Sequence, residues 1–281
     1  MTTLPNTFIT VRVQALGGKF LGDDIGGALI TVRDAQTREL LATGSTAGNS
    51  GTLSSTYAPN ASLSTIVTPN PGQPTIQWLL AADTDSRATT TSAFTASLVL
   101  DRPRLLEVEA YGPLGGLQSA HRVTVTEWIV PGQNLTMPPG LVMLIPGLLV
   151  QVMSPATHTQ YSSAACTDRE MTFQANVAMM CGCPISNAPN NPWLPGDFDV
   201  SAQVRVVGGP YVQRVTLVFD PSGTPSRFTG TYSVPVNTTS NPIYYEAIIT
   251  ARQFSTGNVG TGTVTFFVQP SSSTPQATPS S

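Results

Sequence analysis

Charged residues are scarce in this chain. Lys and Arg number 13 and Asp and Glu 16, so only 10% of the 281 residues are charged, against roughly 25% in an average soluble domain. Lys19 is the single lysine, and no two neighbouring positions are both basic. The net charge of −3 gives no electropositive surface for a polyanion, so nucleic acid is not an expected partner.

Residue types that carry catalysis are equally few. The chain has two histidines, His121 and His158, and three cysteines. It contains no G-x-S-x-G elbow, no glycine-rich phosphate loop and no H-E-x-x-H pair. We therefore expect no enzymatic activity and no cofactor.

Long apolar and amphipathic segments are also missing. The longest apolar stretch, 141–153, is interrupted by Pro146 and is shorter than the roughly 20 residues of a spanning helix, which predicts no membrane insertion. Residues 1–16 lack the basic and apolar regions of a signal peptide. The default expectation is therefore a cytoplasmic protein. The low charge and the Ser/Thr richness favour the alternative, an exported or surface-associated protein.

Turn formers and period-2 alternation take the place of helical patterns. The chain has 24 Gly and 24 Pro, and short alternating segments between them predict an all-β fold of antiparallel sandwiches. The predicted strands are residues 7–15, 28–34, 39–43, 76–81, 93–100, 105–111, 121–130, 141–153, 170–181, 200–207, 212–219, 228–234, 243–252 and 263–268. The Ser/Thr/Asn/Pro tract at 45–73 is expected to be a long loop.

The segment PGQNLTMPPG at 131–140 interrupts the strand pattern and suggests a domain boundary. We predict two consecutive β-sandwich domains, at 1–138 and 139–270. The remaining residues, 271–281, form a Ser/Thr/Pro tail that we expect to be disordered.

Two families resemble parts of the chain. Residues 8–13, 26–34 and 39–44 resemble the opening of carboxypeptidase-regulatory-like, transthyretin-like sandwiches, with a GA-x-V-x-V motif followed by LATG. Residues 256–260 and 264–268 are similar to the last hairpin of bacterial immunoglobulin-like domains. The resemblance implies a transthyretin-like domain followed by an immunoglobulin-like one, acting as spacer, adhesion or interaction modules. It brings no catalytic residues.

Soft side chains crowd together in the segment Met179-Met180-Cys181-Gly182-Cys183. Continued strand alternation from Met171 places Met179, Cys181 and Cys183 on the apolar face and Met180 on the opposite one. One interpretation is therefore two buried, unpaired structural cysteines.

A second interpretation is a disulfide. Cys166 and Cys181 would close a loop of about 15 residues, which the chain-entropy model values at about 3 kcal/mol. Cys181 and Cys183, separated by one residue, are awkward to join directly. The Cys166–Cys181 bridge would leave Cys183 unpaired and imply an oxidising compartment.

A third interpretation is a thiolate metal site. Cys181 and Cys183 could share a Cu or Zn ion, with Cys166, Met179 or His158 completing the shell. The Cys and His spacings match neither a structural zinc site nor a cupredoxin. Redox chemistry or soft-metal binding is therefore the alternative to the main prediction.

Carboxylate pairs spaced by one residue, such as Asp197 and Asp199, could share a calcium ion. Calcium requires six to eight oxygen ligands, and no ligand-dense loop surrounds the pair. We expect these residues to be turn and strand-start positions.

The segment 141–150 is apolar on both faces. A central strand covered on both sides explains it, and packing against another domain or chain is the alternative. Together these features predict a non-enzymatic binding or structural accessory protein. Its partner would be another protein or a second copy of the chain. Whether it binds a small molecule is left open by the sequence.

Overall fold

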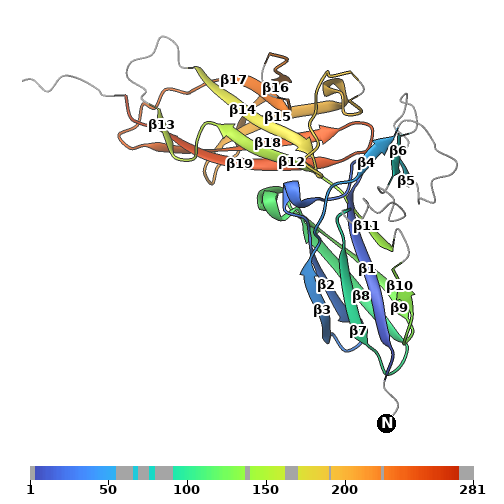
Figure 1. Ribbon diagram of the computed structural model, residues 1–281. Coiled ribbons are helices and arrows are strands. Elements are labelled where there is room, and N and C mark those ends of the chain that lie inside the picture. Colours follow the sequence, from blue (N-terminus) through green and yellow to red (C-terminus); the bar gives the residue numbers. More distant parts are fainter. Residues whose placement is uncertain are drawn as a thin grey trace, which may run out of the picture. The chain divides into compact units, whose positions relative to one another are not determined.

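The computed structural model describes residues 4–54, 66–68, 76–79, 91–136, 140–161, 170–189, 191–222 and 225–271. Contacts between residues divide the chain into two compact units. Figure 1 shows the strands of both units. Unit 1 comprises Met1–Leu149, Ala178–Phe198 and Arg252–Gly260. Unit 2 comprises Val150–Val177, Asp199–Ala251 and Thr261–Ser281.

Unit 1 is built mainly from two sheets (Figure 1). The first has β1 (Asn6–Ala15) at its centre, paired antiparallel with β7 (Phe94–Val99) and parallel with both β10 (Asn134–Leu135) and β11 (Leu141–Ile145). The second has the order β3 (Leu40–Ser45), β2 (Leu29–Asp34), β8 (Arg104–Gly112), β9 (His121–Ile129). β3 contacts β7 and β9 contacts β11, so the two sheets meet along both edges.

Alternating residues fill the space between these sheets. The buried apolar side chains fall at every second position of β1, β2 and β8: Ile9, Val11, Val13, Ile30, Val32, Leu106, Val108 and Ala110. The opposite face of β1 is buried but polar. There Arg12 donates from Nη1 to the carbonyl oxygen of Thr91 at 2.9 Å. Both faces of β1 are therefore covered, which makes it the central strand of the unit.

Three short strands form a further sheet, in the order β4 (Thr52–Ser54), β6 (Ile76–Leu79), β5 (Ile66–Thr68). They lie within and beside the tract 45–73 that the sequence predicts as a loop. The other residues of that tract after Ser54 fall outside the described part of the chain. The short 3₁₀ turns are η1 (Asp23–Ile25), η2 (Leu114–Ser119) and η3 (Pro195–Asp197).

Unit 2 has the strand order of an immunoglobulin fold. Its strands are β12 (Leu148–Ser154), β13 (Thr159–Tyr161), β14 (Glu170–Met179), β15 (Phe198–Val206), β16 (Tyr211–Phe219), β17 (Arg227–Ser233), β18 (Ile243–Gln253) and β19 (Val259–Val268). They follow the path β12-β14-β17-β16-β15-β18-β19-β13. In chain order this is A-B-E-D followed by C-F-G, with β13 added in parallel to the last strand.

An aromatic cluster forms the core of unit 2. Phe266 stacks on Tyr245 with ring centroids 5.3 Å apart. It also meets Phe173 at 6.5 Å and Tyr232 at 6.2 Å in edge-on geometry. Because Phe266 lies on β19 and Phe173 on β14, these contacts join the two halves of the strand path.

The all-β class and the sandwich architecture predicted from the sequence are confirmed. Most predicted strands agree with the observed ones to within one or two residues; the prediction 121–130, for example, corresponds to β9. The sheets are not purely antiparallel, since β1 pairs in parallel with β11. The long connection between these two strands satisfies the need of a parallel pair for a crossover.

The prediction of one strand at 141–153 is wrong. Pro146 and Gly147 separate β11 from β12, because Pro lacks the ladder N–H and Gly147 adopts a φ of 120°. The contact division also differs from a boundary at 138/139, since β11 pairs with β1 and belongs to unit 1. Ser271, predicted to lie in the tail, donates its N–H to the Asn237 carbonyl oxygen at 2.9 Å. The rest of the tail is outside the described residues.

We predict that Phe266→Ala lowers the free energy of unfolding by about 3–5 kcal/mol, because it opens a cavity at the centre of the aromatic cluster. Urea denaturation followed by far-UV circular dichroism measures the loss. Val218→Ala is the matched control: Val218 is 64% exposed, so its truncation should change stability by less than about 0.5 kcal/mol. Equal effects of the two substitutions would contradict the assigned core.

Tyr232→Phe should leave the free energy of unfolding unchanged or raise it, in contrast to Phe266→Ala. Among the described residues, Tyr232 Oη is a buried oxygen with no hydrogen-bond partner, and burial raises the pKa of Tyr232 to about 12. Removing an unsatisfied hydroxyl while retaining the ring avoids its desolvation penalty. We expect unchanged or increased stability, by up to about 1 kcal/mol in the same denaturation assay. A loss larger than that would mean that the hydroxyl has a stabilising partner.

Candidate functional site: a buried thiol pair and its supports

The soft segment predicted from the sequence forms a tight turn at the end of β14. The Gly182 N–H donates to the Met179 carbonyl oxygen at 2.8 Å, and the Met179 N–H donates to the Cys183 carbonyl oxygen at 3.0 Å. Gly182 has a φ of 76°, a left-handed conformation that glycine adopts without steric cost. A bridge between Ala178 and Pro184 closes the turn.

Both cysteines of this turn are buried. Cys181 is 0% exposed and Cys183 8%, which confirms the burial predicted from strand alternation. The position of Met180 was predicted incorrectly: its side chain is 0% exposed, because β14 ends at Met179 and alternation stops there. A Cβ at Gly147 would lie 2.4 Å from Met180 Cε, so the methionine packs directly on that glycine.

The two sulfur atoms are in direct contact, with Cys181 Sγ 2.6 Å from Cys183 Sγ. Burial opposes ionisation of Cys181, but hydrogen bonds from the Cys183 thiol and from the backbone N–H groups of Cys183 and Lys19 lower its pKa. The hydrogen bond to Cys181, together with burial, raises the pKa of Cys183. Of the two sulfurs, Cys181 is therefore the one on which a negative charge is favoured.

The other predicted cysteine and histidine ligands are Cys166 and His158. Cys166 lies outside the described residues. His158 belongs to unit 2, where its backbone N–H donates to the Thr265 carbonyl oxygen at 2.9 Å. The described part of the chain contains no group of three or more His, Cys, Asp or Glu side chains that could hold a metal ion. A soft-metal site therefore stays a prediction that depends on Cys166.

The turn rests on the segment that follows β1. A Cβ at Gly18 would lie 3.2 Å from Cys181 Sγ. Trp193, only 3% exposed, donates from Nε1 to the Gly17 carbonyl oxygen at 2.9 Å. Residues Leu16–Lys19 thus form the surface on which the turn and the tryptophan pack.

The buried side chain of Asn258, which no sequence pattern predicts to be important, binds the same segment. Asn258 is 2% exposed. Its Nδ2 donates to the Leu16 carbonyl oxygen at 2.9 Å, and its Oδ1 accepts the Gly147 N–H at 3.0 Å. Asparagine is so common in turns that its presence in the sequence Thr-Gly-Asn gives no sign of this long-range role.

Asp197 completes this polar cluster. Its carboxylate accepts the Ser255 N–H at 2.9 Å and Gln253 Nε2 at 2.9 Å. Asp199 instead pairs with Arg214 at 3.1 Å. The two carboxylates therefore have separate partners, as expected for turn and strand-start residues, and each is accounted for by protein contacts.

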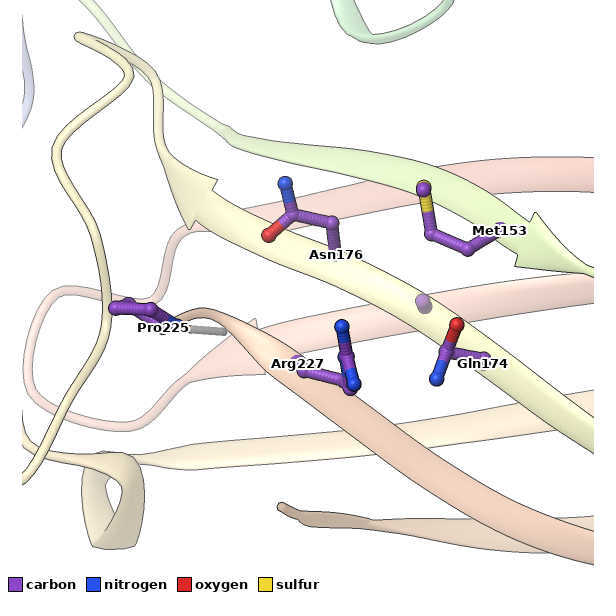
Figure 2. A pocket seen from close by; sticks show the side chains of 6 residues that line it. Met153, Gln174, Asn176, Pro225 and Arg227 are labelled. Atoms are coloured by element: carbon purple, nitrogen blue, oxygen red, sulfur yellow. The ribbon is translucent and has the colours of Figure 1, made fainter. Parts of the chain in front are cut away.

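Unit 2 contains a small cavity of about 100 Å³ (Figure 2). It is lined by Met153, Gln174, Ala175, Asn176, Pro225 and Arg227. Small-molecule sites usually measure roughly 300–1,000 Å³, so this cavity is too small for an organic ligand of that kind. Its wall includes Asn176, whose buried Oδ1 has no hydrogen-bond partner among the described residues.

Comparison with known proteins identifies no family. No family model matches the chain, and no curated protein matches it. One solved structure, the C-terminal domain of the AgI/II polypeptide BspA of Streptococcus agalactiae, aligns over 93% of this chain and 99% of its own at 10% identity. The TM-score of this alignment is 0.19, too low to support a shared fold or function. In the described part of the chain, no helix has the length and apolar character needed to cross a bilayer.

We predict that Asn258→Ala destabilises the chain by about 2–4 kcal/mol, because it leaves the Leu16 carbonyl and the Gly147 N–H without their partner. All three tryptophans, Trp78, Trp128 and Trp193, fall in unit 1, so tryptophan fluorescence during denaturation reports on this unit. Asn6→Ala, at an exposed position of β1, is the matched control and should be nearly neutral. A neutral Asn258→Ala would show that these hydrogen bonds do not hold the unit together.

Proposed function

We propose that this chain is a non-enzymatic binding or structural accessory protein that acts through protein–protein contact. The observation that carries the proposal is an exposed aromatic surface on unit 2, which we call the aromatic patch. It consists of Arg205, Val207, Tyr211, Tyr244, Glu246 and Phe267.

The patch is centred on two aromatic rings. Tyr244 is 56% exposed, and its ring centroid lies 5.6 Å from that of Phe267. Val207, also 56% exposed, lies beside them, since its N–H donates to the Tyr244 carbonyl oxygen at 2.9 Å. Exposed apolar side chains that gather in this way are typical of interaction sites rather than of ordinary surface.

An ion pair borders the rings. Arg205 Nε donates to Glu246 Oε2 at 2.6 Å, and the Arg205 guanidinium lies 5.1 Å from the ring centroid of Tyr211. Tyr244 and Glu246 are two positions apart on β18 and therefore share a face. Tyrosine and arginine are enriched at interfaces, where a desolvated ring surrounded by satisfied polar groups contributes most of the binding energy.

Two finer assignments also belong to the proposal. We assign unit 1 to the transthyretin-like sandwiches on the strength of the motifs at residues 26–34 and 39–44. For the location we keep the cytoplasm as the default, with an exported or surface-associated location as the alternative that the low charge and Ser/Thr richness suit. Neither assignment is needed for the binding role of the patch.

The test compares wild-type protein with Tyr244→Ser. Self-association is measured by size-exclusion chromatography with light scattering over the micromolar range, and partner capture from an extract of the source cells by affinity purification. We expect a complex in at least one assay, weakened roughly 30-fold by Tyr244→Ser, as for a central interface residue.

Val218→Ser is the matched control, because Val218 is an exposed residue of unit 2 that is not part of the patch. It should leave the complex unchanged. A protein that stays monomeric and captures nothing that depends on Tyr244 would overturn the proposed role of the patch.

A further inference from the structure

The two buried sulfur atoms lie closer together than two thiols in ordinary contact do. Cys181 Sγ and Cys183 Sγ are 2.6 Å apart, whereas non-bonded heavy atoms pack most favourably at roughly 3.5–4.0 Å. Sulfur is larger than carbon, so 2.6 Å is short even for a thiol that donates a hydrogen bond to a neighbouring sulfur. The separation lies between thiol contact and a covalent S–S bond of about 2.0 Å.

The backbone brings the sulfurs together. The two hydrogen bonds between Met179 and the residues Gly182 and Cys183 fix a closed turn. The left-handed Gly182 at its centre turns the two cysteine side chains to the same side, a geometry that strand alternation alone does not provide.

Packing leaves the sulfurs little room to move apart. Cys181 Sγ lies beside Gly18, where an added Cβ would be 3.2 Å away, and Ile25 covers the turn 3.7 Å from the position a Gly182 Cβ would occupy. Both cysteines are in unit 1, as are these neighbours. Rotating either cysteine side chain to separate the two sulfurs would therefore disturb a close-packed region.

We propose that Cys181 and Cys183 form a reversible disulfide with each other, and that the co-reactant is an external disulfide of the glutathione type. Cys183 is 8% exposed and Cys181 0%, so the incoming disulfide meets Cys183 first. Cys183 passes its proton to the Cys181 sulfur that it contacts, attacks one sulfur of the external disulfide as the thiolate and forms a mixed disulfide. The external thiolate that is released takes the proton back from Cys181 and leaves as a thiol.

The second step takes place inside the turn. The Cys181 thiolate attacks Cys183 Sγ, the intramolecular S–S bond forms, and the second external thiol leaves. In total, two cysteine thiols lose two protons and two electrons, and one external disulfide is reduced to two thiols. The product has no thiolate at either position. Oxidation therefore removes both cysteines as metal ligands and leaves Cys166 as the one remaining thiol of the chain.

Tryptic peptides test this assignment directly. Cleavage after Arg122, Arg169 and Arg205 places Cys166 in the peptide 123–169 and both Cys181 and Cys183 in the peptide 170–205. The full chain is refolded from denaturant with oxidised and reduced glutathione, quenched with acid, alkylated and digested. Refolding gives the oxidant access to the cysteines before they are buried. Mass spectrometry then reads the state of each peptide.

We expect the peptide 170–205 to be unalkylated and lighter by about 2 Da, the mass of two hydrogens, than its reduced form. The same result is expected for Cys166→Ser, whereas Cys183→Ser should leave Cys181 fully open to alkylation or to a glutathione adduct. Two alkylated cysteines in this peptide under excess oxidised glutathione would overturn the proposal. A link between the peptides 123–169 and 170–205 would overturn it in favour of a bridge to Cys166.

Discussion

The hydrogen bonds of the Asn258 carboxamide are the interaction that joins the chain segments of unit 1. Through one buried side chain Asn258 binds the Leu16 carbonyl at the end of β1 and the Gly147 N–H between β11 and β12. These residues come from three distant parts of the chain. Burying a carboxamide is favourable only when its donors and acceptors find partners, and here the partners are backbone groups of the chain segments that it joins. The same hydrogen bonds therefore satisfy the buried carboxamide and hold the chain segments around Leu16, Gly147 and Asn258 together, a place we call the junction.

The thiol turn and Trp193 occupy the same junction. Trp193 donates to the Gly17 carbonyl oxygen, and Cys181 packs against Gly18, so both rest on residues directly after Leu16. The segments Ala178–Phe198 and Arg252–Gly260 belong to unit 1 although most of the neighbouring chain belongs to unit 2. Short polar and glycine-rich contacts, rather than long strands, account for their attachment to this unit.

Strand alternation predicted most of the fold, because each face of a half-buried sheet needs side chains of one kind at every second position. It failed where the backbone leaves the strand. Alternation continued past Met179 assigned Met180 to the exposed face, and the apolar stretch 141–153 hid the break at Pro146. The burial of Cys181 and Cys183 followed from the pattern, but their contact did not, since it requires the positive φ of Gly182. The role of Asn258 depends on partners more than 100 positions away, which no local pattern contains.

The aromatic patch carries no net charge, in keeping with the scarcity of charged residues in the chain. Its two charged members, Arg205 and Glu246, neutralise each other in an ion pair, so the interaction proposed for the patch would use rings and aliphatic surface rather than an electric field. Exposed ion pairs contribute little free energy by themselves, and the value of this one lies in holding the arginine beside Tyr211. Association at such a surface depends on shape and desolvation. It should therefore proceed at ordinary rates, on the order of 10⁵–10⁷ M⁻¹s⁻¹, with little sensitivity to salt.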